Sequence, residues 1–87
     1  YAVKADIKNN RLYLILKGFL TDEEATEAAN QFVAGIDKLK PGFDVITDIG
    51  EFKPMSASGA AEIARGQKHA REKGVRRIIR VVGQEVI

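Results

Sequence analysis

The first strands are visible in the spacing of apolar residues. Apolar and charged positions alternate over residues 2–8, which is the period of a half-buried β-strand. Asn9 and Asn10 follow, and both residue types tolerate the positive φ of a tight turn. We therefore expect residues 11–17 to fold back as an antiparallel second strand. Apolar residues fall on both of its faces, which predicts a strand covered on two sides.

A helical period follows. Thr21 precedes three carboxylates, and Glu24 stands three residues after it, which is the capping-box spacing of a helix start. Pro41 and Gly42 are typical residues beyond a helix end. Between them, one apolar stripe recurs at helical spacing: Ala25, Ala28, Ala29, Phe32, Ile36 and Leu39.

The second half of the chain repeats the alternation of strand and helix. Residues 43–48 predict a third strand, parallel to its predecessor because a helix separates the two. Residues 49–55 predict a loop, and Ser56 or its neighbour caps a second helix that runs to about Lys73. Residues 76–82 predict a fourth strand. We expect the second helix to approach the sheet closely through small residues, namely Ala57, Gly59, Ala60, Ala61, Ile63, Ala64, Gly66 and Ala70.

These elements predict an α/β domain of order ββαβαβ, a mixed sheet with helices packed on one face. Residues 1–87 form a single domain in this interpretation, 45% apolar and 30% charged, as in ordinary globular proteins. The longest apolar run, residues 12–16, is far short of the ~20 residues that span a bilayer, so we expect no membrane insertion. The chain has no cysteine, which excludes disulfides and thiolate metal sites and suits a cytoplasmic protein.

Charge and titratable residues indicate no enzyme. The basic side chains of residues 61–87 lack interleaved aromatics for base stacking, so nucleic-acid binding is not expected. His69, the single histidine, has no carboxylate or nucleophile placed beside it by the sequence. Asp44, Asp48 and Glu51 match no metal-binding loop. We therefore predict no catalytic residue, no metal and no cofactor.

The segment from residue 48 to residue 60 stands out. A strand ending in an aspartate leads into Phe52-Lys53-Pro54-Met55, and the chain then places Ser56 and Ser58 at a helix start. The free amides and positive dipole of a helix N-terminus favour a phosphate or another anion. From the residues alone, an ordinary N-cap is the preferred interpretation.

This segment resembles the STAS domains, including their SpoIIAA-like relatives, the anti-sigma-factor antagonists. Ser56-Ala57-Ser58-Gly59 occupies the place of that family's Asp-Ser-Ser-Gly motif, and the resemblance covers nearly the whole chain. Ser56 replaces the family's aspartate, and Ala57 replaces the serine that a partner kinase phosphorylates. The resemblance also implies a further helix and strand after residue 82, so we expect the domain to be truncated at its C-terminus.

The resemblance implies a non-catalytic regulatory module for protein binding. Its partner would be an anti-sigma-factor kinase or a signalling assembly, and homo-oligomerisation stays open. The expected partner surface consists of Phe52, Lys53, Pro54, Met55, Ser56 and Ser58, and phosphorylation is expected at Ser58 or Ser56 if it occurs. The alternative function is a carrier of a small apolar ligand or nucleotide, with Tyr13, Ile15, Phe19 and Phe52 lining the site. An enzyme ranks third.

Overall fold

The strands and helices follow the predicted order. The computed structural model describes residues 1–52 and 57–81, with residues 49–52 described by their backbone alone. Four strands form one sheet in the order β1-β2-β3-β4; β1 and β2 are antiparallel, and the other two pairs are parallel, as predicted. The elements are β1 (Ala2–Asp6), β2 (Arg11–Gly18), α1 (Asp22–Ile36), β3 (Asp44–Phe52), α2 (Ala57–Glu72) and β4 (Arg77–Val81).

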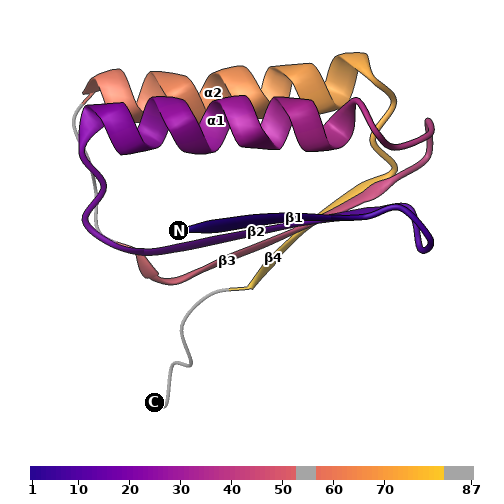
Figure 1. The fold of residues 1–87 in the computed structure, drawn as a ribbon, viewed down its shortest axis with the longest axis horizontal. Helices are drawn as coiled ribbons and strands as arrows, with labels where there is room; N and C mark the ends of the chain where they lie inside the picture. The colour runs from indigo at the N-terminus through magenta and orange to yellow at the C-terminus, as the bar shows by residue number, and fades with distance from the viewer. Residues whose placement is uncertain (53–56, 82–87) are drawn as a thin grey trace.

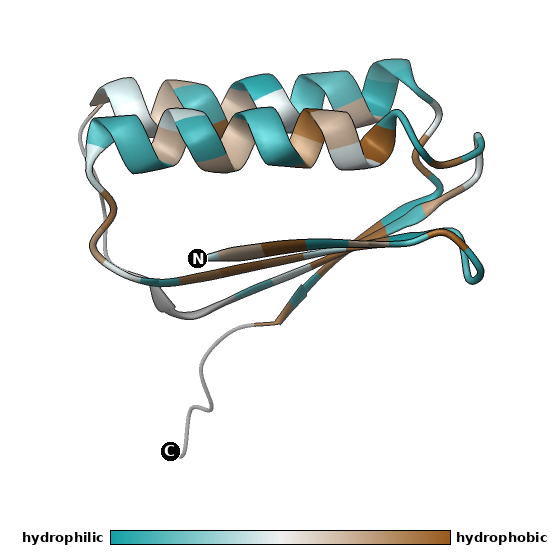
Figure 2. Cartoon of the chain, in the orientation of Figure 1, coloured by the Kyte–Doolittle hydropathy of each residue, from teal (hydrophilic) through white to brown (hydrophobic). Residues whose placement is uncertain are grey.

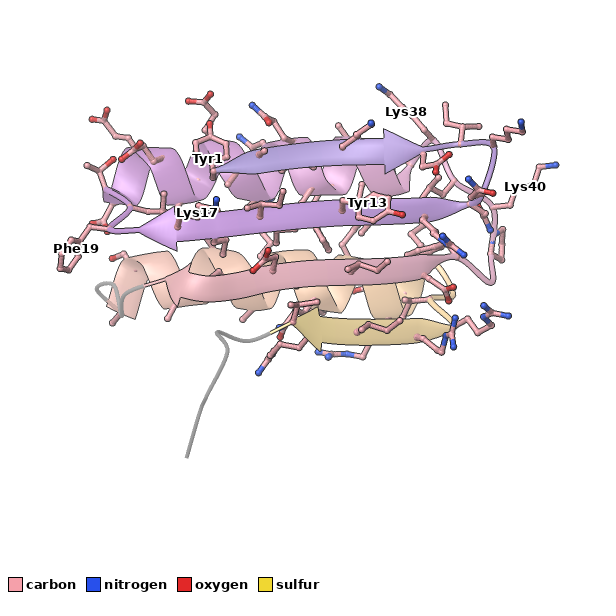
Figure 3. The ribbon with its side chains drawn as sticks, turned by 90° about the horizontal axis from the view of Figure 1, so that it is seen from below. Tyr1, Tyr13, Lys17, Phe19, Lys38 and Lys40 are labelled. Atoms are coloured by element: carbon pink, nitrogen blue, oxygen red, sulfur yellow. The ribbon has the colours of Figure 1, made fainter. Side chains whose placement is uncertain are left out.

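Both helices lie on the same face of the sheet, as expected (Figure 1). They run side by side, with α1 behind β1 and β2 and α2 behind β3 (Figure 3). Helix α1 contacts β1 and β2, whereas α2 packs against α1. In the described residues, neither helix is long and apolar enough to cross a membrane.

Helix α1 begins at the predicted capping box. The Glu24 backbone N–H donates to Thr21 Oγ1 at 3.1 Å, and the Thr21 N–H donates to Glu24 Oε1 at 3.0 Å. The predicted end is wrong by one turn, because the helix stops at Ile36 rather than continuing to Leu39. There the chain tightens into i to i−3 hydrogen bonds, from the Lys38 N–H to the Gly35 carbonyl and from the Leu39 N–H to the Ile36 carbonyl.

The first two strands form the expected hairpin, but β1 ends at Asp6, so the alternation overestimates its length. Ile7 belongs to the turn and is 63% exposed. Asn10 takes a positive φ of 55°. The Asn10 side chain also accepts from the Lys40 N–H at 2.9 Å and donates to the Lys40 carbonyl at 3.1 Å, joining the hairpin to the loop after α1.

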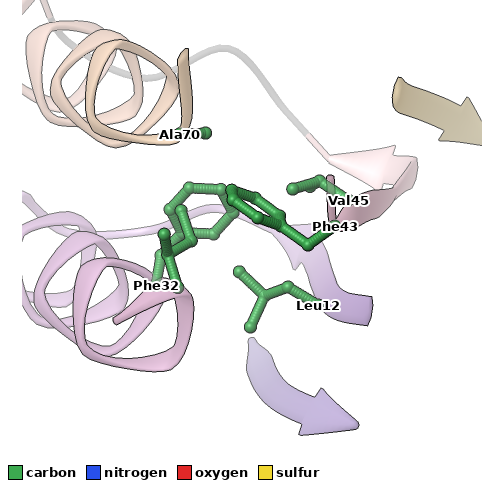
Figure 4. Close-up of a cluster of buried hydrophobic side chains, with 6 residues drawn as sticks. Leu12, Phe32, Phe43, Val45 and Ala70 are labelled. Atoms are coloured by element: carbon green, nitrogen blue, oxygen red, sulfur yellow. The ribbon is translucent and has the colours of Figure 1, made fainter. Parts of the chain in front are cut away.

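The core lies between the C-terminal halves of the helices and the sheet (Figure 4). Each fully buried large apolar side chain stabilises the folded state by about 1.5–3 kcal/mol relative to an exposed one. Backbone bonds close the same end, where the Arg76 N–H donates to the Phe43 carbonyl and the Gly42 N–H to the Gly74 carbonyl, both at 2.7 Å. The core residues are Leu12, Phe32, Ile36, Phe43, Val45 and Ala70.

The opposite face of the sheet carries a regular pattern of charges. At the end of the sheet where β3 begins, Asp6, Arg11, Asp44 and Arg77 are neighbours across the four strands, with alternating sign. Tyr13 lies beyond this row on the same uncovered face (Figure 3). The expectation that β2 is covered on both sides is wrong for the described residues, because both helices occupy the other face.

Strand β3 is longer than predicted. It continues through Phe52, so residues 49–52 belong to the strand and not to the loop that we expected. After an irregularity between Ile15 and Lys17, the parallel pairing resumes, with Lys17 beside Glu51 and Gly18 beside Phe52. Strand β4 is one residue shorter than predicted at its start. Figure 2 shows strongly hydrophobic residues along the strands and alternating hydrophilic and hydrophobic bands along both helices.

Candidate functional site

An apolar cavity lies between the helices and the sheet, beyond the core. Its volume is about 230 Å³. Of the fifteen described residues that line it, eleven are apolar, and the four polar ones are Thr47, Glu62, Gln67 and Arg80. The apolar residues are Leu14, Leu16, Leu20, Ala25, Ala28, Ala29, Phe32, Val45, Ile63, Gly66 and Ile78.

The cavity exists because small side chains line the helices where the sheet presents larger ones. Ala25, Ala28 and Ala29 are buried on α1, and Gly66 is buried on α2. Gly66 lets α2 approach α1 closely, since a Cβ there would lie 3.0 Å from Phe32 Cδ2. Helix α2 is therefore held against α1, and space remains between the two helices and strands β2, β3 and β4.

This arrangement corrects the predicted packing of α2. The alanines at positions 57, 60, 61 and 64 are exposed, so they do not bring the helix close to the sheet. The buried residues of α2 are Gly59, Gly66 and Ala70, which follow one another at about two-turn and one-turn spacings. The buried stripe of α2 thus faces α1. The spacing of the alanines could not show this, because alanines occur on several faces of the helix and do not indicate which face is buried.

The polar residues at the cavity differ in how they are paired. Arg65 donates to Glu62 Oε2 from Nη2 at 2.7 Å and from Nε at 3.1 Å, and it also donates to Asn30 Oδ1 at 2.8 Å. Arg80 is exposed and has no hydrogen-bond or ion-pair partner in the described residues. The cavity therefore combines an apolar interior with one unneutralised cation.

Most of the predicted partner surface lies outside the described residues. This holds for Lys53, Pro54, Met55 and Ser56, and of Phe52 only the backbone, at the end of β3, is described. Ser58 is exposed as the second residue of α2. The structure thus places one of the six side chains, and that one is accessible.

The three carboxylates considered for a metal do not converge. Asp44 opens β3 and is 4% exposed, whereas Glu51 lies at the far end of the same strand. Arg76 Nη2 donates to Asp44 Oδ2 at 2.8 Å, and Arg77 Nη2 donates to the same oxygen at 3.1 Å. These hydrogen bonds hold the pKa of Asp44 well below its usual range. In residues 1–52 and 57–81, no group of three or more His, Asp and Glu side chains is placed to hold a metal ion.

His69 has a carboxylate beside it that the sequence did not place there. His69 Nε2 lies 2.8 Å from Asp37 Oδ1, across the ends of the two helices, and Lys73 Nζ lies 3.9 Å from the same oxygen. Separated by 32 positions, the pair is visible only once α1 and α2 are packed side by side. This contact joins the C-terminal ends of the two helices.

Three of the residues proposed for a carrier site, Tyr13, Ile15 and Phe19, do not line this cavity, and the side chain of the fourth, Phe52, lies outside the described part of the chain. Tyr13 and Ile15 face the uncovered side of the sheet, where they border a more open depression with Lys4 and Asp6. Phe19 is 78% exposed. The cavity lies on the helix side instead, because Leu14 and Leu16, not their odd-numbered neighbours, face the helices.

The fold and the cavity define a small α/β domain in which two helices cover one face of a four-stranded mixed sheet and enclose an apolar space. Comparison of the chain with family models, with curated proteins and with solved structures finds no significant match. The arguments for function therefore come from the residues and the geometry described above.

Proposed function

We propose that this domain is a non-catalytic binding module that holds a small apolar ligand between the two helices and the sheet. The cavity of about 230 Å³ carries this proposal. Well-packed protein interiors leave few voids larger than a water molecule. A space of this size in an 87-residue chain is therefore a feature that needs a reason.

The size and lining of the cavity suggest the ligand. An engineered apolar cavity of about 150 Å³ stays dry and binds benzene, so this one accommodates a somewhat larger molecule. Its volume is below the ~300–1,000 Å³ of sites for drug-sized ligands. A short alkyl chain or a single substituted ring matches both limits.

Filling the cavity tests the proposal. Ala28 is 6% exposed and lines the space, so Ala28→Leu places a larger side chain inside it. We expect this variant to lose binding of 1-octanol and to gain about 0.5–2 kcal/mol in free energy of unfolding, as cavity-filling substitutions do. Titration followed by NMR of the cavity methyl groups measures binding, and urea denaturation measures stability.

Ala34→Leu is the matched control, because Ala34 is exposed on the same helix. It should bind 1-octanol as the wild type does. Failure of the wild type to bind 1-octanol and other small apolar probes, or equal binding by Ala28→Leu, would overturn the proposal.

A second candidate is the protein-interaction module suggested by the resemblance to STAS domains. The predicted order ββαβαβ and the mixed sheet support that resemblance. The exposed small residues at the start of α2, positions 57, 58, 60, 61 and 64, offer a flat surface on which a partner can pack. This surface includes the predicted phosphorylation site Ser58.

Exposure of Ser58 makes the regulatory form of this candidate testable. We expect phosphopeptide mass spectrometry of the protein from its own cells to find a fraction modified at Ser58. A Ser58→Ala variant expressed in the same cells controls for modification at Ser56. Complete absence of phosphate from both serines, under growth and stress conditions alike, would count against regulation at this site.

A further inference from the structure

The chemistry at the edge of the cavity carries an inference about the headgroup of the ligand, and it rests on the proposed function. Strand β4 places Ile78 and Arg80 beside Val45 and Thr47 of β3, and all four residues line the cavity. An arginine on an apolar lining normally extends its stem over the apolar surface and keeps its guanidinium in water. Arg80 therefore presents an apolar stem and a cationic tip at the same opening.

Among the described residues that line the cavity, Arg80 is the cation without a partner. Arg65 donates hydrogen bonds to Glu62 and Asn30, and Arg76 and Arg77 donate hydrogen bonds to Asp44. Glu62, the carboxylate among the described lining residues, is neutralised by Arg65 at 2.7 Å. Because the charges of Glu62 and Arg65 cancel, the lining residues that the structure describes leave one net positive charge, on Arg80.

We infer that the cavity takes a short-chain carboxylic acid, with its alkyl chain inside and its carboxylate on Arg80. The planar fork of a guanidinium matches a carboxylate in bidentate geometry. Thr47 lies beside Arg80 on the neighbouring strand and supplies a hydroxyl donor to the same headgroup. An acid of about eight carbons has one charged end and an apolar body, which is the distribution that the lining shows.

The experiment compares three probes that share an alkyl chain and differ in headgroup: octanoate, 1-octanol and octylamine. They are titrated at neutral pH and low ionic strength into the wild type, Arg80→Gln and Arg80→Lys. We expect Arg80→Gln to weaken octanoate binding about two- to fivefold, the range of an exposed charged contact, and to leave 1-octanol nearly unchanged. Arg80→Lys should retain part of the octanoate affinity because it keeps the charge.

Arg71→Gln is the matched control, because Arg71 is exposed on α2 and does not line the cavity. It should change none of the three affinities. Two results would overturn the headgroup assignment and leave the proposed function standing. One is tighter binding of octylamine than of octanoate. The other is an octanoate affinity that Arg80→Gln does not change, while 1-octanol still binds in the cavity. If no probe binds, the proposed function and this inference fail together.

Discussion

At the scale of single residues, the closest constraint is the contact between Gly35 on α1 and Leu12 on β2. A Cβ at position 35 would lie 2.6 Å from Leu12 Cδ1, a distance that real Cβ atoms do not tolerate. Leu12 is fully buried, so its side chain has no free space into which it can turn. Glycine at position 35 is therefore a packing requirement and sets how closely α1 approaches the sheet.

Gly35→Ala should destabilise the domain although alanine is the better helix former. Overpacking costs about 1–3 kcal/mol, and the gain in helix propensity offsets up to about 1 kcal/mol of it. We expect a net loss of about 1–2 kcal/mol in the free energy of unfolding, measured by urea denaturation.

A second substitution separates the clash from other effects of Gly35→Ala. Leu12→Val removes the carbon that the new Cβ would meet, so the double variant should be more stable than the sum of the two single losses predicts. Strict additivity would show that the contact between these two positions is not the cause.

At the scale of elements, Asp44 fastens the last two strands together. Its carboxylate accepts from Arg76 and Arg77 just where β3 and β4 begin to pair. Because the pKa of Asp44 is lowered in the folded state, its ionised form contributes stability above the unfolded pKa of about 3.9. That contribution disappears as the pH falls through the lower folded pKa.

Asp44→Asn should therefore lower the urea midpoint at pH 7 and flatten its dependence on pH below about 4. The pKa values of Asp6 and Glu24 are also lowered, by hydrogen bonds within their turns, and these groups are present in both proteins. The difference between the wild-type and Asp44→Asn curves of urea midpoint against pH therefore gives the contribution of Asp44 alone. Glu72→Gln, at an exposed carboxylate, is the control, and an Asp44→Asn curve parallel to that of the wild type would contradict the assignment.

The sequence predicts elements best where the signal is local. The capping box at Thr21 and Glu24 and the positive φ at Asn10 each depend on a few consecutive residues, and the structure has both. The end of α1 and the length of β3 were wrong because tertiary contacts decide them. In β3, pairing with Lys17 and Gly18 extends the strand through residues that a propensity argument assigns to a loop.

At the scale of the whole molecule, the two ends of the layer between helices and sheet differ. Phe32 and Phe43 fill one end, and backbone bonds close it. Alanine and glycine leave the other end open as the cavity. The sequence shows these small residues plainly, but it does not show whether a helix uses them to approach the sheet or its neighbouring helix.

The candidate site was therefore the least predictable part. Its lining comes from both helices and three strands, and Arg80 matters only because its neighbours Arg76 and Arg77 are engaged elsewhere. Such pairing depends on which carboxylate folds next to which arginine. The position of Asp44 opposite β4, 32 residues before Arg76, supplies that information only after folding.

The position of β4 at the rim of the sheet has one more consequence. A rim strand with free N–H and C=O groups is a template on which other chains can add, and such growth leads to aggregation. All five residues of β4 are exposed, and Arg77 and Arg80 stand among its β-branched residues. Two copies joined along this strand would bring their two Arg80 guanidinium groups into one ribbon without a neutralising carboxylate from the described residues, and their mutual repulsion opposes a sheet that continues from one molecule to the next.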